Sequence, residues 1–394
     1  MTRSPHRVLF IIGNAEPGKS GVGDYTRLLA DELHKTHLVS SDIISVNDAF
    51  THGEIKEETS ASGNCVLRIP SEFSKGETTR YFHSTLQKTN YNWLSLQYVG
   101  YAFHSLGVAY PLIDLLQSRN KSCRLHIMFH ELWQGLGRHE STISRIKGYL
   151  QKHSIRSLIR RTSPEIIHTH NACYLHLLRE LRVGPKLLPL FGNIPVEKPD
   201  HRRFRLLIRQ HGLPLEIEDH REDFLLIGFF GAIYGGWPIE SCFESIASAC
   251  KKANKIPVYV AIGNAGPGWT GLTETYGTRF SMTSTGFLKE SDISQLLSVL
   301  DFGISTTPYE ATGKSGGAMA FLEHGVPVFA GPNMLRPRMN ISSTEILNGV
   351  FPMDATMEET ILSLPRLKTN PRAIRQVAQK FEEDLHLLDY NQDQ

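Results

Sequence analysis

The chain has 394 residues, of which 40% are hydrophobic and 21% are charged, and its formal net charge is +2 at pH 7. This composition is typical of a globular protein, and its length predicts two domains of similar size. The small net charge excludes a global field that would attract nucleic acid. No apolar run reaches the roughly 18 residues that a membrane-spanning helix needs. The start "MTRSPHRV" leads straight into a strand-like run, so we expect no export signal and a cytoplasmic location.

The cysteines and histidines give no metal or disulfide pattern. The five cysteines are scattered and form no C-x-x-C pair, which favours reduced thiols. The sequence "HTH" contains His168 and His170, but no cysteine or acidic residue lies near them at a zinc-like spacing. We therefore expect ordinary packed histidines here, with no metal and no other cofactor.

Strand-like and helical runs alternate along the whole chain. In the first half, apolar runs predict strands at residues 7–12, 93–98, 124–130, 165–170 and 186–191. The pattern restarts after a proline-rich and charged stretch at 191–205, with strands predicted at 223–231, 258–263, 279–287, 301–305 and 326–331. Apolar strands separated by helices indicate parallel sheets covered on both faces. We therefore predict an α/β protein with two Rossmann-like, doubly wound domains facing across a cleft.

The predicted domain limits follow from this pattern. We expect an N-terminal domain over residues 1–195, a C-terminal domain over 196–365 and a helical segment over 366–394. Ligands of such sheets bind outside the carboxyl ends of the strands, so the loops after the strands are the candidate site.

The loop "GNAEPGKS", residues 13–20, matches the G-x-x-x-x-G-K-S pattern of a phosphate-binding loop. In such a loop the helix begins at or near the Gly-Lys-Ser. Here Gly21 and Gly23 follow, and each glycine inside a helix costs about 1 kcal/mol relative to alanine. We therefore predict a glycine turn over "SGVG" with the helix beginning near Asp24, and keep a triphosphatase or kinase as an alternative.

Several segments in order resemble glycosyltransferases of the GT-B fold, of the retaining family 4 kind. They are "KSGVGDYTRLLADEL", "LSLQYVGYAFHSLGVAYPL", "MFHELW", "LPLFGNIPV", "LIGFFGAIYGG" and "YEATGKSGGAMAFLEHGVPV". The resemblance spans about residues 7–335. It implies sugar transfer from a nucleotide-diphosphate sugar to an unidentified acceptor, with retained configuration and without a metal. The donor would bind the C-terminal domain, and a glycan, a lipid-linked group or a small molecule would be the acceptor.

The resemblance also assigns candidate site residues. It implies catalytic roles for His130 and Glu310, and an acceptor side formed by Gln97, Tyr98 and Glu131. The implied donor-binding residues are Gly21, Gly23, Gly231, Lys314, Ser315, Gly316 and Gly317. From the residues themselves, 313–317 predict a small-residue turn before the helix "AMAFLEH", whose N–H groups and dipole suit a diphosphate.

Two features depart from the family pattern. The stretch "GAIYGGWPIES" contains none of the arginine or lysine residues that usually neutralise the diphosphate. In the family, seven residues separate this glutamate from a second one; counted from Glu310 that position is Ala318, and in the other alignment, counted from Thr312, it is Ala320. A catalytically silent nucleotide- or carbohydrate-binding relative is therefore a further alternative.

The segment 138–161 is basic and carries interleaved apolar residues. Its cations include Arg145, Lys147, Lys152 and Arg156, and its apolar residues are Ile143, Ile146, Leu150, Ile155, Leu158 and Ile159. An amphipathic basic helix of this kind can lie on an anionic bilayer. The alternative is an ordinary domain helix that packs by its apolar side.

Overall fold

A computed structural model describes residues 6–35, 39–120, 122–137, 140–332, 341 and 345–390, the side chains of 387–390 excepted. The beginning of the predicted basic segment, Arg138, lies outside the described residues. The described chain divides into two compact units: the first holds residues up to Pro189 and from Ile374 on, and the second runs from Leu190 to Ala373. Within the described part, no helix is both long and apolar enough to cross a membrane.

The first unit is built on an eight-stranded sheet of order β3-β4-β2-β1-β5-β6-β7-β8. All neighbouring strands are parallel except β3 and β4. The strands are β1 (His6–Ile12), β2 (Val39–Asp48), β3 (Lys56–Thr59), β4 (Cys65–Pro70), β5 (Trp93–Tyr98), β6 (Arg124–Phe129), β7 (Ile166–Thr169) and β8 (Lys186–Leu187). The run predicted at 186–191 therefore pairs over only two residues.

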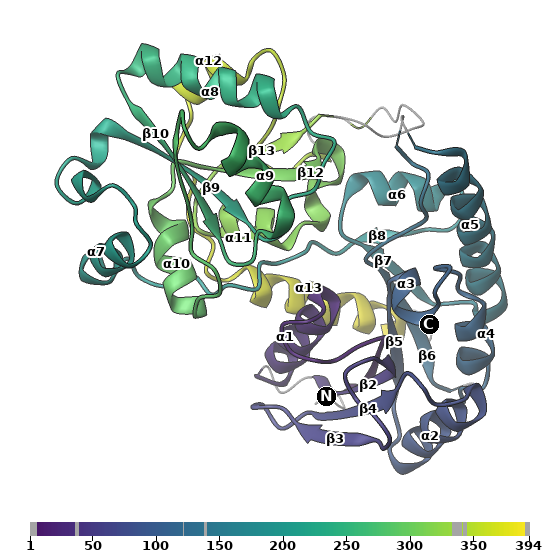
Figure 1. Cartoon of the computed structure of the whole chain (residues 1–394). Coiled ribbons are helices and arrows are strands. Elements are labelled where there is room, and N and C mark those ends of the chain that lie inside the picture. Colours follow the sequence, from purple (N-terminus) through teal and green to yellow (C-terminus); the bar gives the residue numbers. More distant parts are fainter. Residues whose placement is uncertain are drawn as a thin grey trace. The chain divides into compact units, whose positions relative to one another are not determined.

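Seven helices of the described chain belong to this unit. They are α1 (Gly21–Lys35), α2 (Lys75–Lys88), α3 (Gly100–Phe103), α4 (Tyr110–Gln117), α5 (Thr142–Thr162), α6 (Ala172–Arg179) and α13 (Ala373–Tyr390). The chain's last helix, α13, returns to the first sheet (Figure 1), where the Phe381 ring stacks on Phe10 at 5.9 Å between centroids. His386 on the same helix lies 2.8 Å from His6 on β1.

The second unit is built on a six-stranded parallel sheet of order β11-β10-β9-β12-β13-β14. Its strands are β9 (Phe224–Phe230), β10 (Ile256–Ile262), β11 (Ser281–Ser284), β12 (Phe302–Pro308), β13 (Val328–Gly331) and β14 (Val350–Pro352). Its helices are α7 (His201–Gln210), α8 (Ile239–Ala253), α9 (Gly266–Tyr276), α10 (Glu290–Val299), α11 (Gly316–Glu323) and α12 (Met357–Leu362), with 3-10 turns η1 (Leu215–Glu218), η2 (Arg221–Asp223) and η3 (Tyr309–Lys314).

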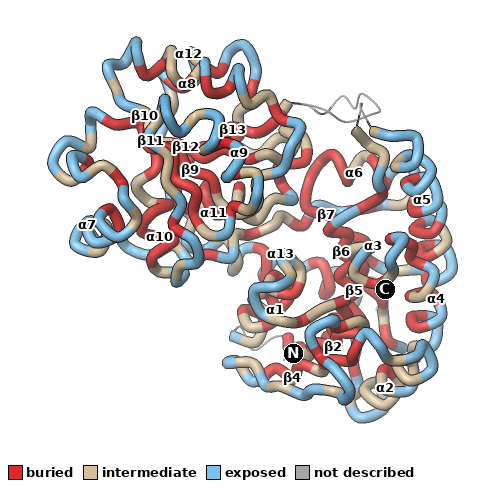
Figure 2. The backbone as a smooth tube through the Cα atoms, in the orientation of Figure 1, coloured by how far each residue is buried: buried red, intermediate tan, exposed pale blue. Residues whose placement is uncertain are grey.

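The central strands of the second sheet, β9, β12 and β13, are mostly buried (Figure 2). Leu226 on β9 packs into one hydrophobic cluster with Val258, whereas Ile227 packs into another with Tyr259. Successive strand residues point to opposite faces, so two clusters on one strand require cover on each face. This arrangement explains the continuous apolar runs and confirms the doubly wound α/β architecture predicted for each half.

The order of the strands reverses at one place in each sheet. Starting from β1, the chain first adds β2 on one side and later β5 on the other. In the second unit, β10 and β11 extend one side of β9, and β12 and β13 extend the other. Loops that leave neighbouring strands in opposite directions open a crevice at their carboxyl ends, which is the usual ligand position in these sheets.

Candidate functional site

The crevice position of the second unit is occupied by the beginning of α11. Ser315 caps this helix, because its hydroxyl accepts a hydrogen bond from the Ala318 N–H at 3.2 Å. A Cβ atom on Gly317 would lie 2.6 Å from the Phe230 carbonyl oxygen, so only glycine lets the helix meet the end of β9 this closely. The predicted turn over 313–317 is wrong in its extent, since α11 already begins at Gly316. Gly317 lies inside the first turn of the helix because the close packing against the end of β9 requires glycine there.

The groups around this helix end suit an anion. The first-turn N–H groups and the dipole of a helix N-terminus favour negative charge. Lys314, the last residue of η3, is exposed beside the Ser315 cap. Gly231 follows β9 with φ +84°, and a Cβ atom there would meet nothing within 4 Å. The backbone after β9 is therefore open to the close approach of a ligand.

The acidic residues near α11 have different surroundings. Glu310 is half-buried within η3. Burial raises the pKa of the neighbouring Tyr309, and the Glu310 and Asp354 charges add to the effect. At the other end of α11, Glu323 Oε1 accepts a hydrogen bond from the Gly192 N–H at 2.6 Å, and burial raises the pKa of Glu323 to about 8. Glu323 therefore holds the segment before α7.

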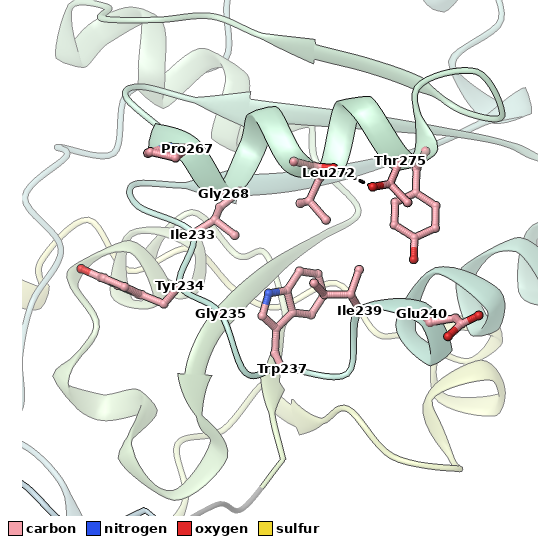
Figure 3. A pocket seen from close by; sticks show the side chains of 12 residues that line it. Ile233, Tyr234, Gly235, Trp237, Ile239, Glu240, Pro267, Gly268, Leu272 and Thr275 are labelled. Atoms are coloured by element: carbon pink, nitrogen blue, oxygen red, sulfur yellow. Dashed lines mark hydrogen bonds between the residues drawn. The ribbon is translucent and has the colours of Figure 1, made fainter. Parts of the chain in front are cut away.

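A pocket of about 410 Å³ lies beside the loop after β9 (Figure 3). Its walls come from that loop and from α8 and α9, and they include Ile233, Trp237, Ile239, Gly268 and Leu272. Trp237 is buried, and its indole Nε1 has no hydrogen-bond partner within the described chain. The apolar lining and the exposed Tyr234 ring suit a flat or apolar group.

In the first unit, the loop after β1 is held in a different way from a phosphate-binding loop. The Gly18 N–H donates to the Asp24 carboxylate at 2.9 Å, and the Gly23 N–H donates to the Ser20 hydroxyl at 3.2 Å. An anion at this loop would face the Asp24 carboxylate, which already accepts the Gly18 N–H. This geometry does not favour the triphosphatase alternative.

The expected position of the α1 start is wrong. Gly21 and Gly23 lie in the first turn of α1 rather than in a turn before it. A Cβ atom on Gly23 would lie 2.7 Å from the Asn14 carbonyl oxygen. Contact between helix and loop therefore outweighs the loss of helix propensity. These two glycines belong to the first unit, whereas Gly231 and the residues 314–317 belong to the second.

The remaining candidate residues follow β5 and β6 in the first unit. His130 is buried, and its Nε2 lies 2.8 Å from Gln97 Oε1. Burial and the neighbouring His170 hold the pKa of His130 well below its usual range. Tyr98 is fully buried, so it belongs to the core in this structure. Glu131 is exposed next to His130.

Sequence reasoning missed the partners of His130. Its Nδ1 lies 2.7 Å from His170 Nε2, so both ring nitrogens contact protein groups. The packed state expected for His168 and His170 agrees with their burial. The sequence did contain a signal for these contacts: polar residues stand at alternate positions of otherwise apolar strands, as in "LSLQY", "RLHIMFH" and "IIHTH", and so lie on one face of the sheet.

Only half of the basic helix packs by its apolar side. Ile155, Leu158 and Ile159 in α5 are buried. By contrast, Ile146 is 58% exposed and Tyr149 is 72% exposed. Counted from Ile143, the other exposed apolar residues of the first half follow at three, six and seven positions, which places all of them on one side of the helix. We call these four residues the α5 apolar patch: Ile143, Ile146, Tyr149 and Leu150.

Comparison with known proteins shows what this fold is shared with. No family model matches the chain, and no curated protein matches it. Solved structures of glycosyltransferases do match it over nearly their whole length. Anabaena HepE, solved with UDP and glucose, has a TM-score of 0.54 at 13% identity, covering 96% of this chain and 98% of that one.

Two other glycosyltransferases give similar values. WaaG, involved in lipopolysaccharide biosynthesis, has a TM-score of 0.53 at 13% identity, covering 95% of this chain and 93% of its own. The pneumococcal O-GlcNAc transferase GtfA, solved with UDP and GlcNAc, has 0.52 at 11% identity, covering 99% of each chain. The chain shares its fold with glycosyltransferases. The similarity confirms the predicted GT-B fold.

Proposed function

We propose that this chain is a glycosyltransferase that takes a sugar from a nucleoside-diphosphate sugar. The observation that carries the proposal is the α11 N-terminus at the carboxyl end of β9, where the strand order of the second sheet reverses. HepE and GtfA, which share the fold, were solved with UDP. The diphosphate would lie against the first turn of α11, with Lys314 supplying a positive charge and Ser315 a hydroxyl.

The finer features of the reaction are also proposals. We infer retained configuration and no metal from the sequence resemblance; helix N–H groups and Lys314 can stabilise a diphosphate leaving group without a metal ion. Glu310, at the start of η3, and His130, after β6, keep their proposed catalytic roles. Glu131, exposed beside His130, would belong to the acceptor side.

Replacing Lys314 by alanine is expected to weaken the binding of the matching nucleoside diphosphate by about tenfold or more, because a charge-assisted hydrogen bond contributes about 1.5–3 kcal/mol. The measurement is the rise in melting temperature on adding UDP, GDP, ADP or TDP and their sugars, since a ligand that binds only the native state raises it. Lys19→Ala, in the loop after β1, is the control and should retain the rise. Equal losses, or a larger loss with Lys19→Ala, would contradict the site.

Turnover separates an enzyme from a silent binding relative. The purified chain is expected to release the free nucleoside diphosphate from the sugar that stabilises it, at least slowly with water as acceptor. Binding without any release, both with water and with a panel of glycan and lipid-linked acceptors, would favour the silent relative.

We further propose that the α5 apolar patch contacts an anionic membrane surface. Exposed apolar side chains rarely gather on one helix without a partner, and Arg145, Lys147 and Arg156 are exposed on the same helix. Each surface cation contributes about 1 kcal/mol of attraction to anionic lipid. A lipid-linked acceptor would be reached at such a surface.

The double substitution Ile146→Ser and Leu150→Ser is expected to lower binding to phosphatidylglycerol vesicles by tenfold or more, because each buried aliphatic side chain contributes about 1.5–3 kcal/mol. Co-sedimentation measures this binding. Leu215→Ser, at an exposed leucine of the second unit, is the matched control. Equal binding of all three proteins, or no binding by the unaltered chain, would exclude the membrane contact.

A further inference from the structure

Polar side chains form a row across one face of the first sheet. They occupy alternate positions of β5, β6 and β7 or directly follow these strands, so they point to the same face: Ser95, Gln97, His126, His130, His168 and His170. All six are at most 6% exposed. The face is covered by α13, whose Phe381 ring lies 5.1 Å from the His126 ring, and by α1, whose Tyr25 ring lies 5.0 Å from the His130 ring.

Contacts of hydrogen-bond length join this row into one chain that runs from a carboxylate to a backbone carbonyl. In order they are Asp384 Oδ2 to His168 Nε2 (3.1 Å), His168 Nδ1 to His126 Nε2 (3.0 Å), His126 Nδ1 to Ser95 Oγ (2.8 Å), Ser95 Oγ to Gln97 Nε2 (2.8 Å), Gln97 Oε1 to His130 Nε2 (2.8 Å), His130 Nδ1 to His170 Nε2 (2.7 Å) and His170 Nδ1 to the Leu188 oxygen (3.2 Å). We call this row the histidine chain.

Both ends of the histidine chain are acceptors. Although burial opposes ionisation, hydrogen bonds from His168 and Lys186 hold the pKa of Asp384 below its usual range, so this end is a carboxylate. Burial also lowers the pKa of each of the four histidines, so they are neutral at pH 7. A neutral imidazole carries one N–H and one acceptor nitrogen.

The histidine chain has one proton too few to make every contact a hydrogen bond. The four imidazoles, the Ser95 hydroxyl and one Gln97 N–H supply six protons for the seven contacts. One contact must therefore lack a proton. A hydrogen bond to an ionised acceptor is roughly twice as strong as one to a neutral carbonyl. The carboxylate end is therefore satisfied, and the contact of His170 with the Leu188 oxygen, the longest at 3.2 Å, lacks the proton.

We propose that Asp384 is a positioning residue that sets the direction of every hydrogen bond in the histidine chain and so fixes the tautomer of His130. Each donor points toward Asp384. His130 is then held in its Nε2–H form, donating to Gln97 Oε1, and its Nδ1 accepts from His170. No covalent bond forms or breaks in this arrangement. The last helix of the chain thereby controls the ring at the carboxyl end of β6.

Replacing Asp384 by asparagine should reverse the direction of every hydrogen bond in the histidine chain. Lys186 lies 2.7 Å from Oδ1 of Asp384, closer than Lys380, which lies 3.8 Å from Oδ2. Lys186 therefore keeps the amide oxygen of the substituted residue on its side, and the amide N–H₂ faces His168. The amide at position 384 then donates a hydrogen bond to His168. With this additional proton, all seven contacts, including that of His170 with the Leu188 oxygen, become hydrogen bonds. All four histidines change from Nε2–H to Nδ1–H, and the Gln97 amide turns over.

The test is nitrogen-15 NMR of histidine-labelled full-length chain at pH 7, in which the two tautomers give distinct ring-nitrogen shifts. The signals of His130 are assigned by their loss in His130→Asn. We expect Nε2–H histidines along the chain in the unaltered protein and Nδ1–H histidines in Asp384→Asn, with melting temperatures recorded for both. Glu383→Gln, which removes an exposed carboxylate one residue away on α13, is the control and should change no tautomer.

Two results would overturn the proposal. One is an Nδ1–H or cationic form of His130 in the unaltered protein, which is decisive even if Asp384→Asn does not fold. The other is a folded Asp384→Asn protein in which His130 remains Nε2–H. The NMR signals do not depend on sugar transfer, so failure here would leave the proposed function untouched.

Discussion

Replacing Arg68 by methionine is expected to lower the free energy of unfolding by about 3–5 kcal/mol, because it leaves the buried Asp48 carboxylate without its counter-charge. Arg68 on β4 is 1% exposed. Its guanidinium contacts both oxygens of Asp48, at 2.9 and 3.1 Å, and also Glu58 at 3.0 Å and Glu16 at 2.6 Å. Asp48 itself is fully buried, so the charge it would keep has no access to water.

The Arg68 group also fixes the loop after β1. The Asp48 carboxylate accepts a hydrogen bond from the Ala15 N–H at 3.1 Å, and Arg27 donates to the Ala15 carbonyl at 2.9 Å. Arg68→Met should therefore loosen residues 14–16 as well as the edge of the sheet. Amide hydrogen exchange should become faster in both places.

Arg209→Met provides the matched control for Arg68→Met. Arg209 also grips one carboxylate, Glu218, with two nitrogens, but its side chain is 65% exposed. Exposed ion pairs contribute about 0–1 kcal/mol. Urea unfolding of both variants measures the difference. A loss below about 1 kcal/mol for Arg68→Met would show that water reaches this group.

The second large effect is a pH-dependent gain in stability for Glu323→Gln. Burial raises the pKa of Glu323 from its ordinary value of 4.5 to about 8 in the folded chain, so the folded state keeps a proton that the unfolded state releases between these values. The contribution of Glu323 to the free energy of unfolding is fully present below about pH 4.5 and is lost as the pH rises through 8. The shift corresponds to at most about 5 kcal/mol at high pH.

Glutamine removes this loss because its amide stays neutral while its oxygen can still accept from the Gly192 N–H. The gain over the unaltered chain should therefore be several kcal/mol at pH 9 and near zero at pH 4.5, as measured by urea unfolding at a series of pH values. Glu274→Gln, on the exposed side of α9, is the control. A gain that does not vary with pH would contradict burial as the cause.

The sequence alone was sufficient for the strands that are apolar throughout. Runs such as 223–231 and 258–263 can be recognised without knowledge of their partners, because hydrophobic residues cover both faces of the strand. It was not sufficient for β2 and β4. Ser45 and Asp48 on β2 and Arg68 on β4 are buried through hydrogen bonds to one another and to the backbone, which a hydrophobicity pattern does not record.

The helix starts failed for a similar reason. Propensity places Gly23 and Gly317 in turns, but both lie in helices because the carbonyls of Asn14 and Phe230 leave no room for a side chain. Such close approaches join residues that are distant in sequence, so no local pattern can predict them. The same holds for Asp384, whose place beside His168 depends on the return of α13 to the first sheet.

That return has a consequence for biosynthesis. Phe381 and Leu385 are fully buried, and Phe381 stacks on Phe10 near the beginning of the chain. A ribosome therefore releases the whole second unit, from Leu190 to Ala373, before it supplies the helix that completes the first. Until then, the part of the first sheet that α13 covers, around Phe10 and His126, is open to water and to other nascent proteins. Premature termination anywhere in the second unit would leave the first without its closing helix.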